Sequence, residues 1–366
     1  MNNRIKVIKL LCLLLIFLNP VSLKAETTEI EKVENAEITV ITPYLEETIH
    51  KDKNLVYCGT FQLAWNVLQD NIYKGPLELE KNKEFATYMN RQLFNEDYIS
   101  DDSHVTDADY LTQDFVDKLN NELKTKFGSD APVVSERPVK DLSILSYSYL
   151  YKNIQFNIKF DSFNSPFYFK DSKVKSFGIS KNLKTDSMSF LESLMSNKEG
   201  LREQVYVLDY QNNSDFIIEL ETKNGKDNIV LAKIKPESTL LKTIDVVKNR
   251  ISTKIHNIED MYLKNDEVLK IPEIKFDIEH SYSDIIGDTI LNNGKKEKIE
   301  KAVQHIKFQL DENGVALESE AKITVYKSMS RSFIFDSPFL IYLEEKEAKY
   351  PYLALWIGNS DLLVKY

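Results

Sequence analysis

The sequence predicts an α+β fold in which most helices come first and pack on mixed or antiparallel β-sheets. Two patterns along the 366-residue chain carry this prediction. Up to about residue 135, apolar residues recur at three- and four-residue spacing, as in amphipathic helices. From about residue 141 that period is lost and aromatic residues accumulate, as in strands. Because helices and strands come in separate runs, alternating βαβ units are disfavoured.

The first 25 residues are predicted to be a secretory signal peptide. A basic start precedes an unbroken apolar run over 10–18, which Asn19 and Pro20 interrupt. Ala25 supplies the small residue after which we expect cleavage. The apolar run is short for a membrane span, and an uncleaved anchor is the alternative. The mature chain is therefore expected to be secreted or otherwise extracytoplasmic, without a membrane span.

The composition excludes several classes of protein. The chain has 47 Lys and Arg against 57 Asp and Glu, so it lacks the basic excess that nucleic-acid binding requires. Hydrophobic residues make up 42% and charged residues 28%, as in globular rather than disordered chains. Cys58 is the one cysteine after the predicted leader, so we expect no internal disulfide. Its apolar neighbours favour a buried thiol over a nucleophile. A monomer without cofactor or metal is expected.

After the leader, we expect a polar segment over 26–54, with a short strand at 38–41, and then a single domain over 55–366. Its helical part covers about 55–135 and its sheet-rich part about 140–366. Three helices are predicted from the apolar stripes Phe61, Ala64, Leu68 and Ile72; Phe85, Met89 and Leu93; and Leu111, Phe115, Leu119 and Leu123.

The second half is predicted to consist mostly of strands. One helix interrupts them, opened by Pro236 and carrying Leu240, Ile244, Val247 and Ile251 on one face. The predicted strands are 144–151, 154–160, 166–169, 204–210, 215–221, 228–234, 267–278, 302–312, 317–326, 333–343 and 351–357.

No catalytic or nucleotide-binding motif is found, and we do not expect an enzyme. Two clusters of acidic residues and histidine deserve testing as metal sites: Glu46, Glu47 and His50, and Asp277, Glu279, His280 and Asp284. Strand alternation would turn Glu279 and His280 to opposite faces, which disfavours convergence on zinc. We therefore interpret both clusters as surface. A hydrolase with carboxylates from distant segments is a further alternative.

The C-terminal third resembles the serpins. Three segments carry the resemblance: HIKFQLDENG (305–314) is similar to the strand leading into the hinge of the reactive loop, FDSPFLIY (335–342) to the strand after that loop, and LALWIGN (353–359) to the closing strand. Gly314 and Pro338 are 24 positions apart, close to the family's spacing for hinge and loop. Similar segments at 147–161, 206–220 and 271–284 follow the family's order, so the likeness covers roughly 140–366. The N-terminal helical region is markedly shorter than in serpins.

The resemblance implies a loop that acts as bait for a protease and then inserts into the large sheet as a new strand. Here the loop would be 315–333, inserting between the strands over 141–151 and 301–312. The hinge candidates are Glu312, Gly314, Val315 and Leu317, and the reactive-loop candidates are Lys327, Ser328, Met329 and Arg331. Lys327 would suit a trypsin-like protease with an acidic specificity pocket.

Alternation within the hinge fits a half-buried strand. One face would carry Val315, Leu317, Ser319, Ala321 and Ile323, and the other Ala316, Glu318, Glu320, Lys322 and Thr324. Inhibitory serpins have small residues where this chain has Leu317, Glu318 and Glu320, and bulky residues should slow insertion. A non-inhibitory binding or structural protein with the same scaffold, in which the loop is a polar surface connection, is therefore the alternative function.

Overall fold

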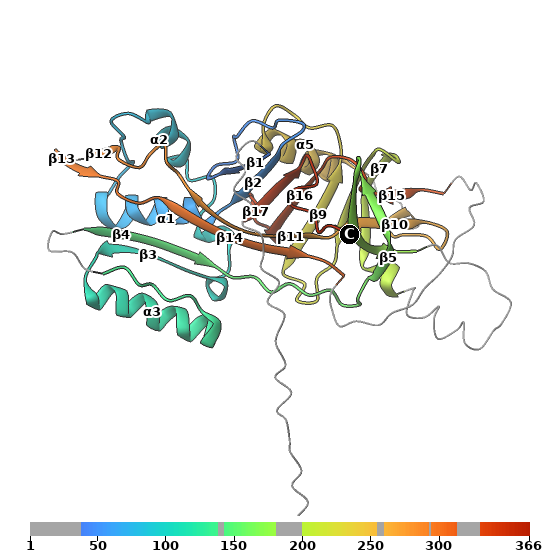
Figure 1. Cartoon of the computed structure of the whole chain (residues 1–366), viewed down its shortest axis with the longest axis horizontal. Helices are drawn as coiled ribbons and strands as arrows, with labels where there is room; N and C mark the ends of the chain where they lie inside the picture. The colour runs from blue at the N-terminus through green and yellow to red at the C-terminus, as the bar shows by residue number, and fades with distance from the viewer. Residues whose placement is uncertain (1–37, 138–142, 181–199, 255–259, 293, 313–329) are drawn as a thin grey trace, which may run out of the picture. The chain divides into compact units, whose positions relative to one another are not determined.

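The α+β class that the sequence predicts is confirmed in the computed structural model of the chain (Figure 1). The structure describes residues 38–137, 143–180, 200–254, 260–292, 294–312 and 330–366, all of which belong to one compact unit. The predicted leader and the predicted strand at 317–326 lie outside the described residues. The described α-helices are α1 (Thr60–Val67), α2 (Lys83–Met89), α3 (Gln113–Phe127) and α5 (Leu240–Thr253).

A seven-stranded sheet lies at the centre of the largest core cluster. Its strands, in spatial order, are β1 (Thr39–Thr42), β2 (Asn54–Cys58), β17 (Leu353–Ile357), β16 (Phe339–Glu345), β9 (Asp227–Lys233), β8 (Asp215–Leu220) and β7 (Val205–Asn212). β1 and β2 are parallel, and the other pairs are antiparallel. Every residue of β2 and β17 is buried, as expected for strands covered on both faces.

A second sheet has four strands. In spatial order these are β15 (Ser332–Ile334), β10 (Val268–Pro272), β6 (Ser172–Ile179) and β5 (Asp161–Phe169). β10 ends at Pro272, which has no N–H to extend a ladder, and one residue later the chain enters another strand. The predicted single strand over 267–278 is therefore wrong, because two strands in different sheets occupy that range.

The remaining described strands form three separate two-stranded ladders. They are β3 (His104–Tyr110) with β4 (Ile144–Leu150), β11 (Ile274–Ser281) with β14 (Val303–Leu310), and β12 (Thr289–Asn292) with β13 (Lys295–Lys298). β4 and β14 correspond to the predicted strands at 144–151 and 302–312. β2, β3, β6 and the β12–β13 hairpin were not predicted from the sequence.

The helices begin and end at recognisable signals. Thr112 caps α3 by accepting a hydrogen bond from the Phe115 N–H at 3.2 Å, and Thr239 caps α5 through the Lys242 N–H at 3.3 Å. α1 continues directly into a π-helical turn over Leu68–Tyr73. The stripe that includes Leu68 and Ile72 is therefore helical as predicted, but its second half is a π-helix and not an α-helix.

Two other strand predictions need correction. Segment 154–160 contains no strand, because the Gln204 side chain satisfies the Ile158 backbone: it accepts from the Ile158 N–H at 3.0 Å and donates to the Ile158 carbonyl at 2.6 Å. A single bridge joins Phe156 to Thr222. The range 333–343 is two strands, β15 and β16, in different sheets, separated by a turn that contains Pro338.

Candidate functional site

The β3–β4 and β11–β14 ladders both rest on α1. Ser146 of β4 donates from Oγ to the Ala64 carbonyl at 2.5 Å. Gln304 of β14 donates from Nε2 to Thr60 Oγ1 at 2.8 Å. Thr60 and Ala64 are about one helical turn apart, a rise of roughly 6 Å. The two strands are therefore held on one short helix at neighbouring positions.

β4 and β14 run in the same direction. At their starts, Ile144 packs in the same apolar cluster as Ala302. Glu136, a few residues before β4, forms an ion pair of 3.0 Å with Lys301, just before β14. At their ends, Leu150 and Leu310 both contact the large core cluster.

These two strands make no backbone ladder with each other in the described residues. β4 pairs only with β3 there, and β14 only with β11. Every residue of β4 is half-buried, a lower burial than in β2 and β17, whose residues are all buried. The arrangement is thus two parallel strands on a common support that form no ladder with each other in the described residues.

The two faces of this arrangement differ in polarity. Ile306 and Leu310 of β14 are buried on the inner face, whereas His305 and Lys307 are exposed on the outer face. On β4, Tyr147 and the other outward side chains pack against the buried stripe of α3. On its β14 side, a strand entering between β4 and β14 would therefore need an apolar inner face and a polar outer face.

Most of the predicted hinge and bait residues lie outside the described residues: Gly314, Val315, Leu317, Lys327, Ser328 and Met329. Glu312 is described just after β14, and its carboxylate lies 3.7 Å from the Lys159 ammonium. Glu312, the first of the hinge candidates, therefore lies in a bend two residues after the end of β14.

Arg331 stands at the other end of the predicted loop, next to β15. Its guanidinium forms a two-point ion pair with Glu267, at 2.6 and 3.0 Å, and donates to the Asp260 and Tyr262 carbonyls. The side chain is 17% exposed and lies over the Phe333 ring. These contacts hold the Arg331 guanidinium in place next to the start of β15.

A cluster of carboxylates surrounds a cavity of about 390 Å³ beside the predicted hinge. Glu273, Asp311 and Glu312 line it together with Lys175. Burial, and then the neighbouring charge of Glu312, raises the pKa of Glu273 to about 7. Glu273, which lies beside the end of β14, therefore gains its negative charge only near neutral pH.

We expect Glu273→Gln to make the protein more stable than wild type at pH 8. Between the ordinary glutamate pKa of about 4.3 and the raised value, folded Glu273 keeps a proton that the unfolded chain has released, so wild-type stability falls as pH rises through this window. The gain should be on the order of 2 kcal/mol after allowance for partial exposure. Urea unfolding at pH 4.5 and pH 8 measures it.

The two proteins should be equally stable at pH 4.5, where the wild-type carboxyl is also neutral. Glu279→Gln, on an exposed position of the same strand β11, is the matched control and should shift stability by less than about 0.5 kcal/mol at either pH. An equal gain from both variants would mean that general charge repulsion, not the environment of Glu273, sets the effect.

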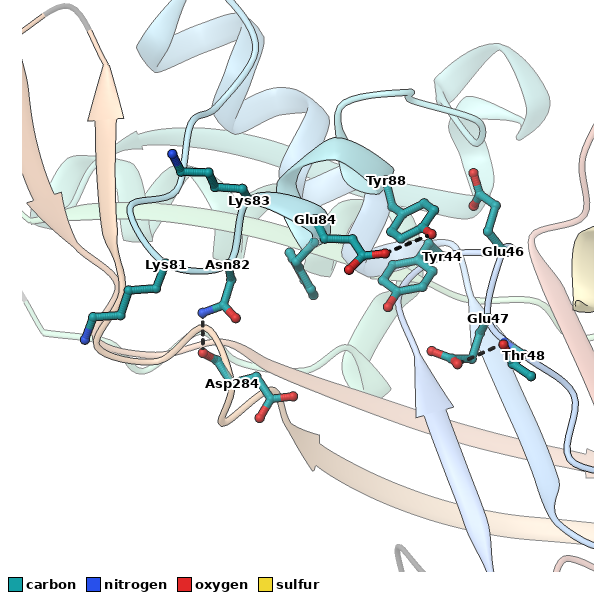
Figure 2. Close-up of a pocket in the computed structure, with 11 residues that line it drawn as sticks. Tyr44, Glu46, Glu47, Thr48, Lys81, Asn82, Lys83, Glu84, Tyr88 and Asp284 are labelled. Atoms are coloured by element: carbon teal, nitrogen blue, oxygen red, sulfur yellow. Dashed lines mark hydrogen bonds between the residues drawn. The ribbon is translucent and has the colours of Figure 1, made fainter.

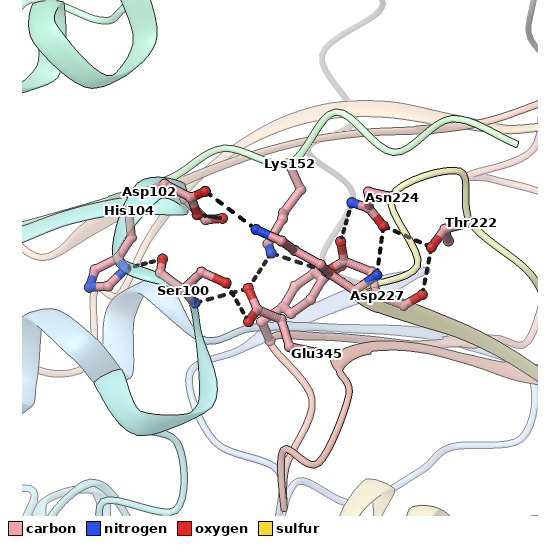
Figure 3. A network of polar contacts seen from close by, with 11 residues as sticks. Ser100, Asp102, His104, Lys152, Thr222, Asn224, Asp227 and Glu345 are labelled. Atoms are coloured by element: carbon pink, nitrogen blue, oxygen red, sulfur yellow. Dashed lines mark hydrogen bonds and ion pairs between the residues drawn. The ribbon is translucent and has the colours of Figure 1, made fainter.

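The chain just after β4 is tied to the seven-stranded sheet by a buried charge cluster (Figure 3). The Lys152 ammonium lies 3.0 Å from Asp227 of β9 and also pairs with Glu345 of β16. Ser100 donates to Glu345 from its N–H and its hydroxyl, at 2.9 and 2.6 Å. Tyr352 donates to Asp227 at 3.2 Å. This cluster holds the end of β4 against the seven-stranded sheet. No local sequence pattern pointed to it.

The other predicted residues have ordinary structural positions. Cys58 is buried as expected, and its burial raises the pKa of the thiol. Glu46 pairs with Arg91 at 2.7 Å, and Asp277 pairs with His305 across the β11–β14 ladder. Among the described residues, no group of three or more His, Cys, Asp or Glu side chains is arranged to hold a metal ion. None of the described helices is both long and apolar enough to cross a membrane.

Comparison with known proteins gives matches in structure but not in sequence. No protein-family model matches the chain, and no curated protein matches it in sequence. Among solved structures, thyroxine-binding globulin in complex with thyroxine matches with a TM-score of 0.46 and 9% identity, over 84% of this chain and 93% of that one. Human glycosylated kallistatin matches with a TM-score of 0.38 and 14% identity, over 68% of this chain and 65% of that one. Both are serpins, the family that the sequence resembles.

Proposed function

We propose that the chain is a secreted, serpin-like inhibitor of a trypsin-like serine protease. Its bait is the segment 315–333, and the part before the cleaved bond becomes a strand between β4 and β14. The observation that carries the proposal is the pair of parallel strands, β4 and β14, that both rest on α1 and do not pair with each other in the described residues.

The direction of the chain supports the insertion. A segment that leaves β14 after Leu310 and folds back between the strands would run antiparallel to both β14 and β4. It would complete two ladders at once, satisfying backbone groups on both edges. Its alternation also fits, because Val315, Leu317 and Ile323 would face the core beside Ile306, while the charged face would point outward.

The chemistry at the bait follows from the protease. The protease serine oxygen adds to the Lys327 carbonyl carbon, the bond to Ser328 breaks, and the new amino terminus takes the proton. Lys327 is then an ester on the protease. Insertion of the hinge would carry that ester, and the protease with it, away from its docking position before water completes hydrolysis. Lys327 is preferred over Arg331, whose guanidinium is engaged by Glu267.

We expect a complex with trypsin that survives denaturation in SDS, and its loss in Lys327→Ala. The reason is that an acyl-enzyme is covalent, whereas an ordinary protease–substrate complex dissociates. SDS gel electrophoresis after mixing with trypsin is the measurement. Lys349→Ala, which removes an exposed lysine elsewhere in the sequence, is the control and should still form the complex. Cleavage of the loop with release of active trypsin would falsify the inhibitory proposal.

A binding or structural role without inhibition is the second candidate. The observation that favours it is the presence of Leu317, Glu318 and Glu320 where a rapidly inserting hinge would have small residues. A bulky, charged segment enters a sheet slowly, and slow entry lets the protease finish cleavage. In this candidate the cleaved chain gains no new strand, so cleavage should not raise its melting temperature.

A further inference from the structure

The cavity of about 390 Å³ lies at the end of β14, where the chain leaves that strand for the predicted hinge. The β11–β14 ladder ends with the pair Ile274 and Leu310, so Glu273 and Asp311 occupy the next position along each segment. Glu312 follows, and all three carboxylates line the same cavity. The predicted hinge therefore begins among three acidic side chains.

The Glu273 carboxyl is half-buried and, among the described residues, forms no hydrogen bond or salt bridge. Tyr366 lines the same cavity, but its hydroxyl donates to the Asn164 carbonyl at 2.6 Å. A carboxyl that loses water without gaining a donor is more stable with its proton than without it.

Two carboxylates in a larger cavity have the donors that Glu273 lacks (Figure 2). That cavity, of about 530 Å³, lies between the segment after β1 and the start of α2. There Glu84 accepts from the Tyr88 hydroxyl at 3.3 Å, and Glu47 accepts from the Thr48 N–H at 2.9 Å. Lining a cavity does not by itself leave a carboxylate without a donor, but the position of Glu273 does.

Charged groups of both signs surround Glu273. Asp311 and Glu312 oppose its negative form from the chain after β14, and Lys175 of β6 favours it. The Lys159 ammonium, from the segment before β5, lies 3.7 Å from the Glu312 carboxylate. Ionisation of Glu273 therefore changes this group of side chains from neutral to net negative, because its two cations then face three carboxylates.

We infer that Glu273 is a proton-dependent latch on the first residues of the hinge, an inference that rests on the proposed function. With its proton, the carboxyl is a donor for the Asp311 or Glu312 carboxylate, and the chain after β14 stays beside the cavity. Without its proton, it repels both carboxylates, and the repulsion falls when that chain moves away to enter between β4 and β14. The pKa of Glu273, about 7, places this change between pH 6 and pH 8. Insertion should therefore be faster at pH 8.

Trypsin treatment of wild type and Glu273→Gln at pH 6 and pH 8 tests the latch. The glutamine amide donates as the protonated acid does and cannot ionise, so the variant should stay latched at both pH values. At pH 8 its ratio of SDS-stable complex to cleaved chain should be lower than the wild-type ratio by roughly threefold or more, the equivalent of about half a pKa unit of repulsion. At pH 6 the two ratios should be equal. Comparing the two proteins at one pH cancels the pH dependence of trypsin itself.

Hydrogen exchange of the uncleaved protein gives a second measurement, which does not require inhibition. Relative to α5, and after correction for intrinsic rates, the wild-type segment 306–312 should exchange roughly threefold faster at pH 8 than at pH 6. Glu273→Gln should remove that difference. Glu279→Gln, which removes an exposed charge further along β11, is the control and should behave as wild type in both measurements.

The two measurements separate the latch from the proposed function. If no protein forms a complex at either pH, the proposed function fails, and hydrogen exchange alone decides on the latch. Equal complex ratios for wild type and Glu273→Gln at pH 8, or equal pH dependence of exchange in the two, would overturn the latch. An equal effect of Glu279→Gln would also overturn it, because diffuse surface charge would then be sufficient.

Discussion

Cleavage at Lys327–Ser328 is expected to raise the melting temperature of the chain by on the order of 10 °C or more. The inserted strand would have a ladder on each side, with β4 and β14, and each new hydrogen bond contributes about 1 kcal/mol net. A gain of 1 kcal/mol shifts the melting temperature of a large domain by roughly 2–4 °C, so several kcal/mol produce a large shift. Differential scanning calorimetry of intact protein, and of protein nicked in the loop by a protease that it does not trap, measures it.

Two variants show whether insertion causes the rise. Ile323→Asp places a charge on the face that would enter the core, and the nicked variant should melt close to its intact form. Thr324→Asp places the same charge on the outward face and should keep most of the rise. If nicked and intact wild-type protein melt together, the non-inhibitory candidate is the better account, because the cleaved segment gains no strand.

Lys152→Met is expected to destabilise the protein by about 3 kcal/mol. The change leaves Asp227 and Glu345 without their shared cation, and Asp227 is only 1% exposed. Removing one partner of a buried ion pair typically costs 3–5 kcal/mol, because the remaining charge is buried and uncompensated. The free energy of unfolding in urea at pH 7 is the measurement.

The matched control is Lys226→Met, which removes an exposed lysine 3.7 Å from exposed Asp102 and should cost less than about 1 kcal/mol. Burial would raise the pKa of Glu345, but its contacts with Lys152 and Ser100 lower it, so the loss in Lys152→Met should also shrink as the pH falls through that lowered value and the Glu345 carboxylate takes up its proton. Similar losses from the two variants would show that Lys152 acts only through general surface charge.

Some strands could be predicted from the sequence and others could not, for physical reasons. β4 was predictable because its tyrosines and branched residues have no helical period, and β17 because it is an unbroken apolar run. β3 was not, since its few apolar residues, including Val105 and Ala108, do not alternate and its position depends on pairing with β4. A local pattern cannot reveal a strand that its partner stabilises.

The candidate site was predictable only in part. The strands that border the proposed insertion were identified, because each has its own sequence pattern. The features that give them their geometry join distant segments: Ser146 and Gln304 meet on α1, and Lys152 meets Asp227 and Glu345.

The seven-stranded sheet has a consequence for how the chain acquires its structure. β2 pairs with β17, and Asn54 accepts hydrogen bonds from the N–H groups of Gly358 and Asn359, about 300 positions later. During synthesis, β1 and β2 must therefore wait, without their permanent neighbour, until residue 357 has been made. Closing so long a loop is slow. The sheet is thus completed late, and until then the apolar residues of β2 lack the strand that covers them and are open to aggregation.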